Sequence, residues 1–224
     1  NTLTYSWLQP NSALTVMSGT GKYIGVVVTA MVNGVYEFTP FIINVETGVR
    51  TEKPKLDKSH IAAAISDNGD LIILEEESAT SKYYNSNGDL IAMTAPDGMR
   101  GPTVTASSSN GEILVGFAQN ISDRIYHPVR WVRKEVQVLE SPKKTLLDTP
   151  LDVGAYARGC SADGSIIYGS VADDQSALFW KNDKVDFIGR NQIKVHTITI
   201  NHTGQDVTYP VVDRPIFFAD HSSM

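Results

Sequence analysis

Short apolar runs, separated by polar turns that contain glycine, recur along the whole chain. The clearest pairs of runs are His60–Ile65 with Leu71–Leu74, Thr103–Ser107 with Ile113–Phe117, and Tyr156–Cys160 with Ile166–Val171. Apolar runs of this length, bounded by turn residues, predict β-strands rather than helices. We expect a short helix or loop only around Ser141–Thr149, next to Pro142 and Pro150. The pattern therefore predicts an all-β protein.

One turn pattern recurs five times in the same register. It consists of Ser or Asn, any residue, then Asp, Asn or Thr, then Gly, a polar residue and apolar residues; its first positions are Ser18, Ser66, Ser108, Ser161 and Asn201, and its glycines are Gly21, Gly69, Gly111, Gly164 and Gly204. Glycine here supplies the positive φ of a tight hairpin turn, and the Ser or Asn side chain bonds the turn's backbone. The glycines are 48, 42, 53 and 40 residues apart. That spacing is typical of four-stranded propeller blades.

Each repeat continues with a second apolar or aromatic strand, a polar turn and a further strand. Trp131 and Trp180 fall at equivalent places in this second half, and Tyr84 and Ile43 are assigned to the same slot. Large aromatic side chains at a repeated position favour packing between blades over stacking on a ligand.

The two ends of the chain predict how the ring closes. Thr4–Ala13 looks like a second half without its first half, whereas His196–Tyr209 is a clear first half followed by a short second half at Pro215–His221. Pairing of the N-terminal segment into the C-terminal blade would remove both exposed edges. We therefore predict one domain over residues 1–224, a β-propeller of five blades. The alternative is a partial ring of a larger propeller.

Composition excludes several classes of protein. With a net charge of −6 and 20% charged residues, the chain lacks the basic excess of a general nucleic-acid binder. No apolar run approaches the roughly 20 residues of a membrane-spanning helix. The single cysteine, Cys160, excludes an internal disulfide and a cysteine-built zinc site. We expect no nucleic-acid partner and no membrane span; the oligomeric state cannot be read from the sequence.

The fourth repeat carries a family resemblance. Gly159–Ser170, followed by Ala177–Trp180 and Asp186–Gly189, contains a Ser-x-Asp-Gly turn, an apolar strand ending in Gly-Ser, an Ala-x-Phe-Trp strand and a closing Gly. This segment resembles the HAF-type extracellular repeat of exported bacterial proteins and autotransporter passenger regions. The second and third repeats match in the turn, and the first and fifth match weakly. The resemblance implies an exported bacterial protein with propeller-like repeats, and it implies no catalytic residue.

Three residues are candidates for binding a ligand. His60 and His196 lie near the starts of first strands, where we expect them to be partly exposed and without acidic partners, and Arg158 lies on a first strand. Asp67–Asp70, Asn85–Asp89 and Asp173–Asp174 offer oxygen atoms, but too few in any one place for a calcium site. We therefore predict no metal and no cofactor.

The sequence contains no recognisable catalytic motif: there is no nucleophile elbow, no phosphate-binding loop and no His-Glu-x-x-His. The turn resembles the Asp box of sialidases, but Asp163 directly precedes Gly164, which departs from that spacing. Cys160 is expected to be a small buried residue rather than a nucleophile.

Two classes of function follow. The first is a non-catalytic module that binds a protein or a glycan, because the first-strand residues are mostly small and uncharged and propellers present variable loops on a rigid frame. Its expected binding loops are Glu75–Lys82, Asn120–His127 and Ser141–Asp152. The second is a glycan hydrolase, which would need paired carboxylates. A structural spacer within a larger surface protein is a further alternative.

Overall fold

The computed structural model describes residues 12–84, 89–146, 149–173 and 175–188, and strands at 195–202 and 205–212. For 12–14, 144–146, 149–151 and the two strands at 195–202 and 205–212, only the backbone is described. The chain divides into two compact units, 1–186 and 187–224.

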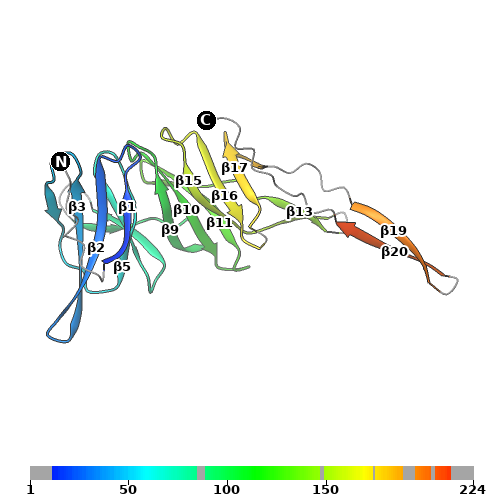
Figure 1. The fold of residues 1–224 in the computed structure, drawn as a ribbon, viewed down its shortest axis with the longest axis horizontal. Coiled ribbons are helices and arrows are strands. Elements are labelled where there is room, and N and C mark those ends of the chain that lie inside the picture. Colours follow the sequence, from blue (N-terminus) through cyan, green and yellow to red (C-terminus); the bar gives the residue numbers. More distant parts are fainter. Residues whose placement is uncertain are drawn as a thin grey trace. The chain divides into compact units, whose positions relative to one another are not determined.

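The first unit is built from four-stranded antiparallel sheets whose strands follow one another in chain order (Figure 1). The first sheet comprises β1 (Ser12–Met17), β2 (Tyr23–Val32), β3 (Val35–Asn44) and β4 (Arg50–Glu52). The second comprises β5 (His60–Ile65), β6 (Leu71–Glu75), β7 (Thr80–Tyr84) and β8 (Leu90–Ala92). The third comprises β9 (Met99–Ser107), β10 (Ile113–Asn120), β11 (Tyr126–Val132) and β12 (Glu135–Val138). The fourth comprises β15 (Ala155–Cys160), β16 (Ile166–Val171), β17 (Ala177–Lys181) and β18 (Lys184–Phe187).

Two hairpins complete the described strands. One is β13 (Lys143–Leu146) with β14 (Thr149–Asp152), and the other, in the second unit, is β19 (Val195–His202) with β20 (Gln205–Val212). The expected helix or loop at Ser141–Thr149 is therefore wrong, because this segment contributes to a hairpin. Proline was taken as a sign against a strand, but proline is compatible with an edge strand. In a two-stranded hairpin each strand has a free edge, and Pro150 needs no ladder hydrogen bond there.

The first strands of successive sheets are neighbours: β1 contacts β5, β5 contacts β9, and β9 contacts β15. Side-by-side meander sheets with adjacent first strands are the arrangement of propeller blades. The residues that the structure describes hold four such sheets, and the fifth repeat is the hairpin β19–β20. Leu3–Leu8, the segment predicted to close the ring, lies outside the described residues.

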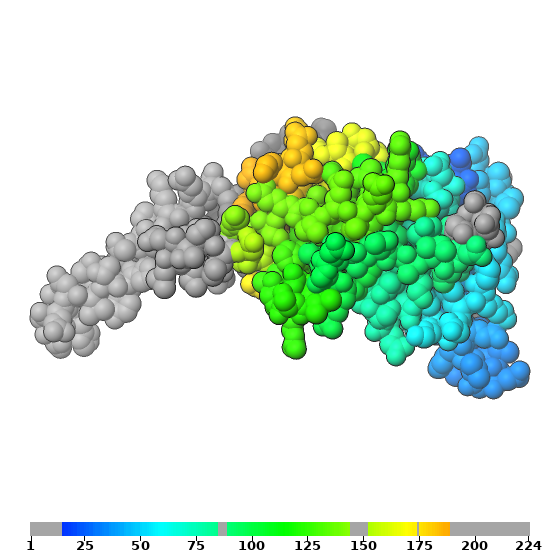
Figure 2. Space-filling model, turned by 180° about the vertical axis from the view of Figure 1, so that it is seen from behind, coloured from blue at the N-terminus to red at the C-terminus, as the bar shows by residue number. Residues whose placement is uncertain are grey.

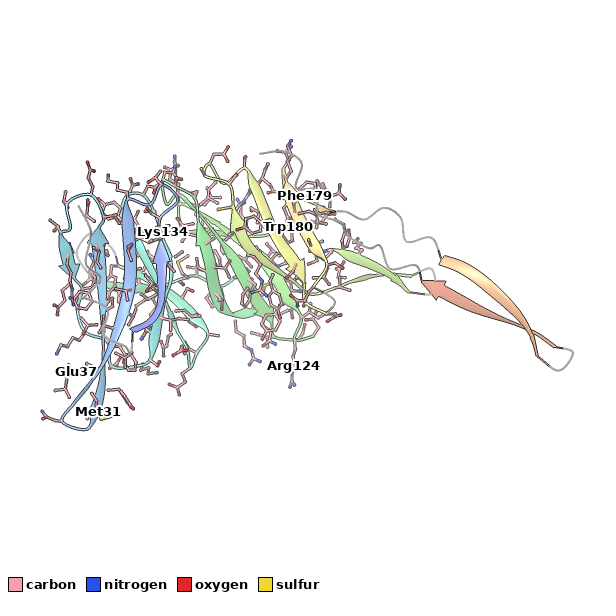
Figure 3. All side chains as sticks on the ribbon, viewed as in Figure 1. Met31, Glu37, Arg124, Lys134, Phe179 and Trp180 are labelled. Atoms are coloured by element: carbon pink, nitrogen blue, oxygen red, sulfur yellow. The ribbon has the colours of Figure 1, made fainter. Side chains whose placement is uncertain are left out.

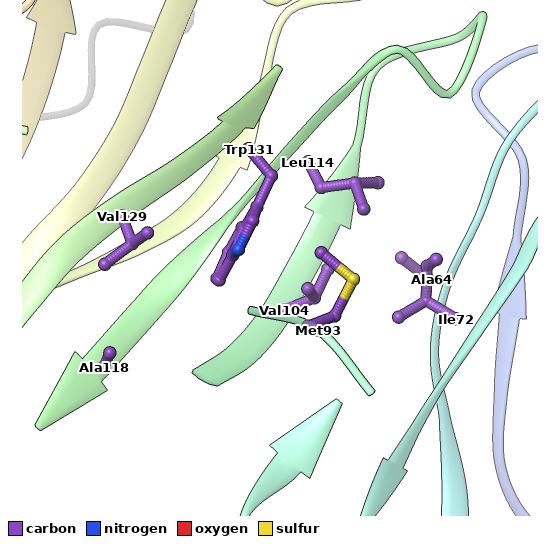
Figure 4. Packing of buried hydrophobic residues seen from close by; sticks show 8 residues of the cluster. All are labelled: Ala64, Ile72, Met93, Val104, Leu114, Ala118, Val129 and Trp131. Carbon is purple, nitrogen blue, oxygen red and sulfur yellow. The ribbon is translucent and has the colours of Figure 1, made fainter. Parts of the chain in front are cut away.

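The hydrophobic core lies between sheets. One cluster joins the first two sheets and includes Val27 and Ile73, both fully buried. A second cluster joins the second and third sheets and is drawn in Figure 4: Ala64, Ile72 and Met93 face Val104, Leu114, Ala118, Val129 and Trp131. Burial of apolar side chains from both partners is what fixes one sheet on the next.

The two tryptophans pack between sheets, as expected: Trp131 is 0% exposed and Trp180 is 1% exposed. In the second sheet, however, the position equivalent to Trp131 and Trp180 is occupied by Tyr83 and not by Tyr84. Trp131 pairs with Leu114 and Trp180 with Ile167, and the equivalent Ile72 pairs with Tyr83. Successive side chains on a strand point to opposite faces, so an error of one residue selects the wrong face.

The glycine turns meet at one end of the sheets. Gly21, Gly69, Gly111 and Gly164 have φ between +71° and +83°, and each donates its N–H to the carbonyl of the serine three residues earlier. Neighbouring turns are also bonded to each other: Asp67 donates its N–H to the Ser109 carbonyl at 2.7 Å, and Ser109 donates to the Ala162 carbonyl at 2.8 Å. The repeated turns therefore connect adjacent sheets through backbone hydrogen bonds. Gly204 lies outside the described residues, and Asn201 is described only as backbone in β19.

Candidate functional site

A pocket of about 340 Å³ lies between the third and fourth sheets, at the end opposite the glycine turns. The β10–β11 loop, the link from β14 to β15, the start of β15 and the β16–β17 loop all contribute to it. Its lining residues are Arg124, Ile125, Tyr126, Asp152, Val153, Gly154, Tyr156, Ala172 and Asp173. The volume is at the lower end of the range for small-molecule sites.

Three aromatic rings form a cluster at this pocket. Tyr156 lies 4.8 Å from Phe117 and 5.3 Å from Tyr126, and Phe117 and Tyr126 are 5.6 Å apart, measured between ring centroids. The two pairs that involve Phe117 are edge-to-face, the arrangement that aromatic quadrupoles favour. Each ring is therefore held by the other two, and two tyrosines from different sheets reach the pocket on a rigid base.

Arg158 lies beside this cluster because of a repeated β-bulge. The register of β15 with β16 shifts between Ala157 and Gly159, and equivalent shifts occur in the second and third sheets. A bulge adds one residue to a strand and redirects its side chain. The Arg158 guanidinium carbon lies 4.6 Å from the centroid of the Tyr156 ring. Burial, with Tyr126 and Asp173 adding to it, raises the pKa of Tyr156, while Arg158 opposes that shift.

The β10–β11 loop is braced by its own hydrogen bonds. Asn120 accepts the N–H of Arg124 on its carbonyl at 3.0 Å and the N–H of Ser122 on its side-chain oxygen at 2.9 Å. Gln119 donates to the Arg124 carbonyl and accepts two hydrogen bonds from Arg100. Arg124 has a φ of +63°, and its side chain extends from the end of the loop (Figure 3).

Gly154 lies where the loops converge. A Cβ there would lie 3.2 Å from the Cβ of Ala172 and 3.4 Å from the carbonyl oxygen of Tyr126, so a larger residue would press on the pocket walls. Asp152 and Asp173 add carboxylates to the lining, and Arg124 adds a cation. The pocket thus combines aromatic rings with carboxylates that accept hydrogen bonds and a guanidinium group that donates them.

His60 does not lie at this pocket. The expectation that it is partly exposed and has no acidic partner was wrong. Its side chain is 1% exposed, and its Nε2 is 4.0 Å from a carboxylate oxygen of Glu75. The reason is the β5–β6 register, which places Glu75 directly opposite His60. Nδ1 of His60 is 2.8 Å from the Lys58 carbonyl oxygen. His60 is therefore a buried histidine with an acidic neighbour, inside the second sheet.

The other predicted residues are placed as follows. The backbone of His196 lies in β19, and its side chain lies outside the described part. Burial raises the pKa of the Cys160 thiol to about 11, and the neighbouring Asp163 adds to the rise. Within the described residues, no three His, Cys, Asp or Glu side chains gather closely enough to hold a metal ion. The same residues include no helix that is long and apolar enough to cross a bilayer.

Sequence reasoning selected two of the segments that form the pocket and missed one main residue. Asn120–His127 contains Arg124 and Tyr126, and Ser141–Asp152 ends at Asp152. Tyr156 was not singled out, although it follows the Ser141–Asp152 segment closely. Glu75–Lys82, the third predicted loop, does not line the pocket.

Its sheets make this chain an all-β protein of the β-propeller type, with an aromatic, charged pocket at the loop end of two blades. No protein-family model matches the chain, and no curated protein matches its sequence significantly.

Several solved structures are similar to the chain. TolB from Acinetobacter baumannii is 17% identical over 74% of this chain, with a TM-score of 0.45. The β-propeller domain of the trilobed protease from Pyrococcus furiosus is 11% identical over 91% of this chain, with a TM-score of 0.39. An acylaminoacyl peptidase is 14% identical over 86%, with a TM-score of 0.43. The matches span 39% of the TolB chain, 78% of the propeller domain and 34% of the peptidase chain.

Proposed function

We propose that this protein is a non-catalytic binding module that recognises a glycan or a protein segment at the pocket between its third and fourth sheets. The observation that carries the proposal is the pair of pocket tyrosines, Tyr126 and Tyr156, braced by Phe117 and surrounded by charged side chains. Aromatic rings that are already ordered offer apolar contact area at low entropic cost, and nearby charged groups fix the ligand's orientation.

The test is a binding screen against a glycan array and a peptide library, followed by titration of each hit with pocket variants. We expect Tyr156→Ala to weaken binding at least about tenfold, since it removes a buried contact surface. Tyr168→Ala is the matched control, because Tyr168 is a 51% exposed tyrosine on β16 that does not line the pocket. Equal effects of the two substitutions, or hits that both leave unchanged, would place the binding site elsewhere.

A glycan hydrolase is the second candidate, and one observation favours it: Asp152 and Asp173 line the same pocket. Paired carboxylates are the usual machinery of glycoside hydrolysis. Incubating the protein with any glycan that it binds, and analysing the products, separates the two functions. Hydrolysis that is lost in Asp152→Asn or Asp173→Asn would establish the enzyme; intact glycan after long incubation would favour binding alone.

We also propose that the protein is exported by a bacterium, as the HAF-type resemblance of Gly159–Ser170 implies, and that its binding serves adhesion. Fractionation of the source cells with an antibody against the chain tests this. Protein in the periplasm, at the cell surface or in the medium supports export, and protein confined to the cytoplasm contradicts it.

A fifth blade is proposed as well, with residues 195–212 as its first half and Leu3–Leu8 completing it. The support is exposure at the two ends of the row of sheets. On β16, Ile166 is 42% exposed, whereas the equivalent Leu71 is 2% exposed; on β1, Met17 is 67% exposed, whereas the equivalent Ile65 is 4% exposed. A crystal structure tests closure: Leu3–Leu8 must pair beside the C-terminal blade, and an unpaired Trp7 segment would favour a partial ring.

A further inference from the structure

Acidic side chains outnumber basic ones in the lining of the pocket between the third and fourth sheets. These sheets adjoin along β10, β11 and β15, and Figure 2 shows their green and yellow-green surfaces in contact. The lining includes two carboxylates, Asp152 and Asp173, and one guanidinium group, that of Arg124. The Arg124 side chain extends outward from the end of its loop (Figure 3). The chain as a whole carries a net charge of −6, so the electrostatic potential at the pocket favours a cation.

Hydrogen bonds of the β16–β17 loop hold Asp173 at the pocket. Ala172, the residue before it, donates its N–H to the Gly154 carbonyl oxygen at 2.8 Å, which ties the loop to the link between β14 and β15. The side chain of Gln175, a residue with a φ of +58°, donates to the Ala172 carbonyl oxygen at 3.1 Å. The backbone that carries the Asp173 carboxylate is therefore braced against the start of the fourth sheet.

The Asp173 carboxylate acts on the Tyr156 ring. Burial is the main cause that raises the pKa of Tyr156, and the negative charge of Asp173 adds to the rise, so the two groups lie close enough to interact. A carboxylate beside an aromatic ring suits an ammonium or guanidinium group, because the ring face and the carboxylate both attract a cation. The chain itself provides an example, since the guanidinium carbon of Arg158 lies 4.6 Å from the Tyr156 centroid. Tyr156 lines the pocket and Arg158 does not.

Asp152 is the second carboxylate of the lining, and a lysine lies across from it. It ends β14, where it pairs with Lys143 in the ladder of the β13–β14 hairpin. Opposite charges on facing strands attract each other, so Lys143 balances part of the Asp152 charge. Val153 donates its N–H to the Pro142 carbonyl oxygen at 3.0 Å, which fixes the backbone after Asp152. We therefore expect Asp173 to contribute more than Asp152 to the attraction of a cation.

We propose that the pocket takes a basic side chain, arginine or lysine, from a segment of a partner protein. This inference rests on the proposed function and names the chemical class of its ligand. The methylene groups of the basic side chain lie against Tyr126 and Tyr156, and its charged end forms an ion pair with Asp173. Residues on either side of it in the segment contact the loops around the pocket. Charge complementarity of this kind selects the partner more than it adds affinity.

Pools of labelled random peptides that differ only in a fixed central residue test the class of ligand. The central residue is arginine, lysine, citrulline or glutamate, and the flanking positions hold uncharged residues; citrulline has nearly the shape of arginine and no charge. Fluorescence polarisation measures binding to the full chain. We expect the arginine and lysine pools to bind at least about tenfold more tightly than the citrulline pool, and added salt to reduce this preference. Equal binding of the arginine and citrulline pools, or preference for glutamate, would overturn the inference.

Asp173→Asn tests which group selects the basic residue. It should lower the ratio of arginine-pool to citrulline-pool affinity to about one and leave citrulline binding unchanged, and Asp152→Asn should lower the ratio less. Asp57→Asn is the matched control, because Asp57 is an exposed aspartate between the first and second sheets that does not line the pocket. An unchanged ratio in Asp173→Asn, or an equal fall in Asp57→Asn, would contradict the assignment. Far-ultraviolet circular dichroism checks that every variant is folded.

Tyr156→Ala separates failure of this inference from failure of the proposed function. Peptide or glycan binding that Tyr156→Ala weakens and Asp173→Asn leaves unchanged would keep the pocket as the binding site and overturn its basic ligand. Binding that Tyr156→Ala leaves unchanged, or no binding of any peptide or glycan, would overturn both. Binding of the arginine pool that both substitutions weaken would support both.

Discussion

The indole Nε1–H of Trp131, in the third sheet, donates a hydrogen bond of 2.8 Å to the carbonyl oxygen of Thr94, which follows the last strand of the second sheet. Trp180 in the fourth sheet makes the same bond, also 2.8 Å long, to the Glu140 carbonyl after the last strand of the third. Each tryptophan thus fills the space between two sheets and ties its indole to the preceding one.

Replacing Trp131 by Phe keeps most of the buried ring and removes the N–H donor. The Thr94 carbonyl loses its partner, so we expect the free energy of unfolding to fall by about 1–3 kcal/mol, from the lost bond and the smaller ring. Urea denaturation followed by circular dichroism measures it. Trp180→Phe should behave alike, and Tyr168→Phe, at an exposed site, should change stability by less than about 0.5 kcal/mol. An unchanged free energy of unfolding in Trp131→Phe would contradict the role of the hydrogen bond.

Gly116 and Gly169 occupy equivalent positions five residues after their turn glycines. A Cβ on Gly116 would lie 1.9 Å from the Thr103 carbonyl oxygen, and one on Gly169 would lie 2.0 Å from the Tyr156 carbonyl oxygen. Backbone cannot move aside as a flexible side chain can, so Gly116→Ala should displace β9 and lower the thermal midpoint strongly. Gly98→Ala is the control: no atom lies within 4 Å of its added Cβ, and only its φ of +71° opposes the change. Equal midpoints for the two variants would contradict this packing.

Glu75 should make the stability of the folded protein depend on pH in the acidic range. Hydrogen bonds from Lys82 and then Lys58 lower its pKa from 4.5 to about 2. Because the folded-state pKa lies below the unfolded-state value, its contribution is complete above about pH 4.5 and is lost as the pH falls towards 2. Urea denaturation between pH 2.5 and 7 should therefore show a weaker acid dependence for Glu75→Gln than for the unmodified protein. An unchanged slope in Glu75→Gln, with Glu135→Gln as the exposed control, would contradict the assignment.

Cys160 should react slowly in the folded protein. Burial raises the pKa of its thiol to about 11, and only the thiolate attacks an alkylating or disulfide reagent. We expect labelling by a thiol reagent at pH 8 to be at least about 100-fold slower in the native protein than in urea. Rapid native labelling would show an accessible thiolate and would reopen a chemical role for this cysteine.

The sequence by itself determined the repeat. Its turn pattern requires glycine at a positive φ and a short polar side chain three residues earlier, and both are local demands that any fold must meet. The bounds of His60–Ile65 and Ile166–Val171 were predicted correctly for the same reason, since strand length and turn residues lie close together in the chain. Trp131 and Trp180 could be assigned to packing because their position repeats.

Only the tertiary structure decided which side chains meet across sheets. Tyr126 and Tyr156 are 30 residues apart and converge because β15 packs beside β11, which no local pattern encodes. The partner of His60 depended on strand register, and a one-residue shift in β7 exchanged Tyr84 for Tyr83. Strand register and the packing of one sheet on the next are non-local properties. The pocket could therefore be located only from the tertiary structure, whereas the all-β fold class could be predicted from the sequence.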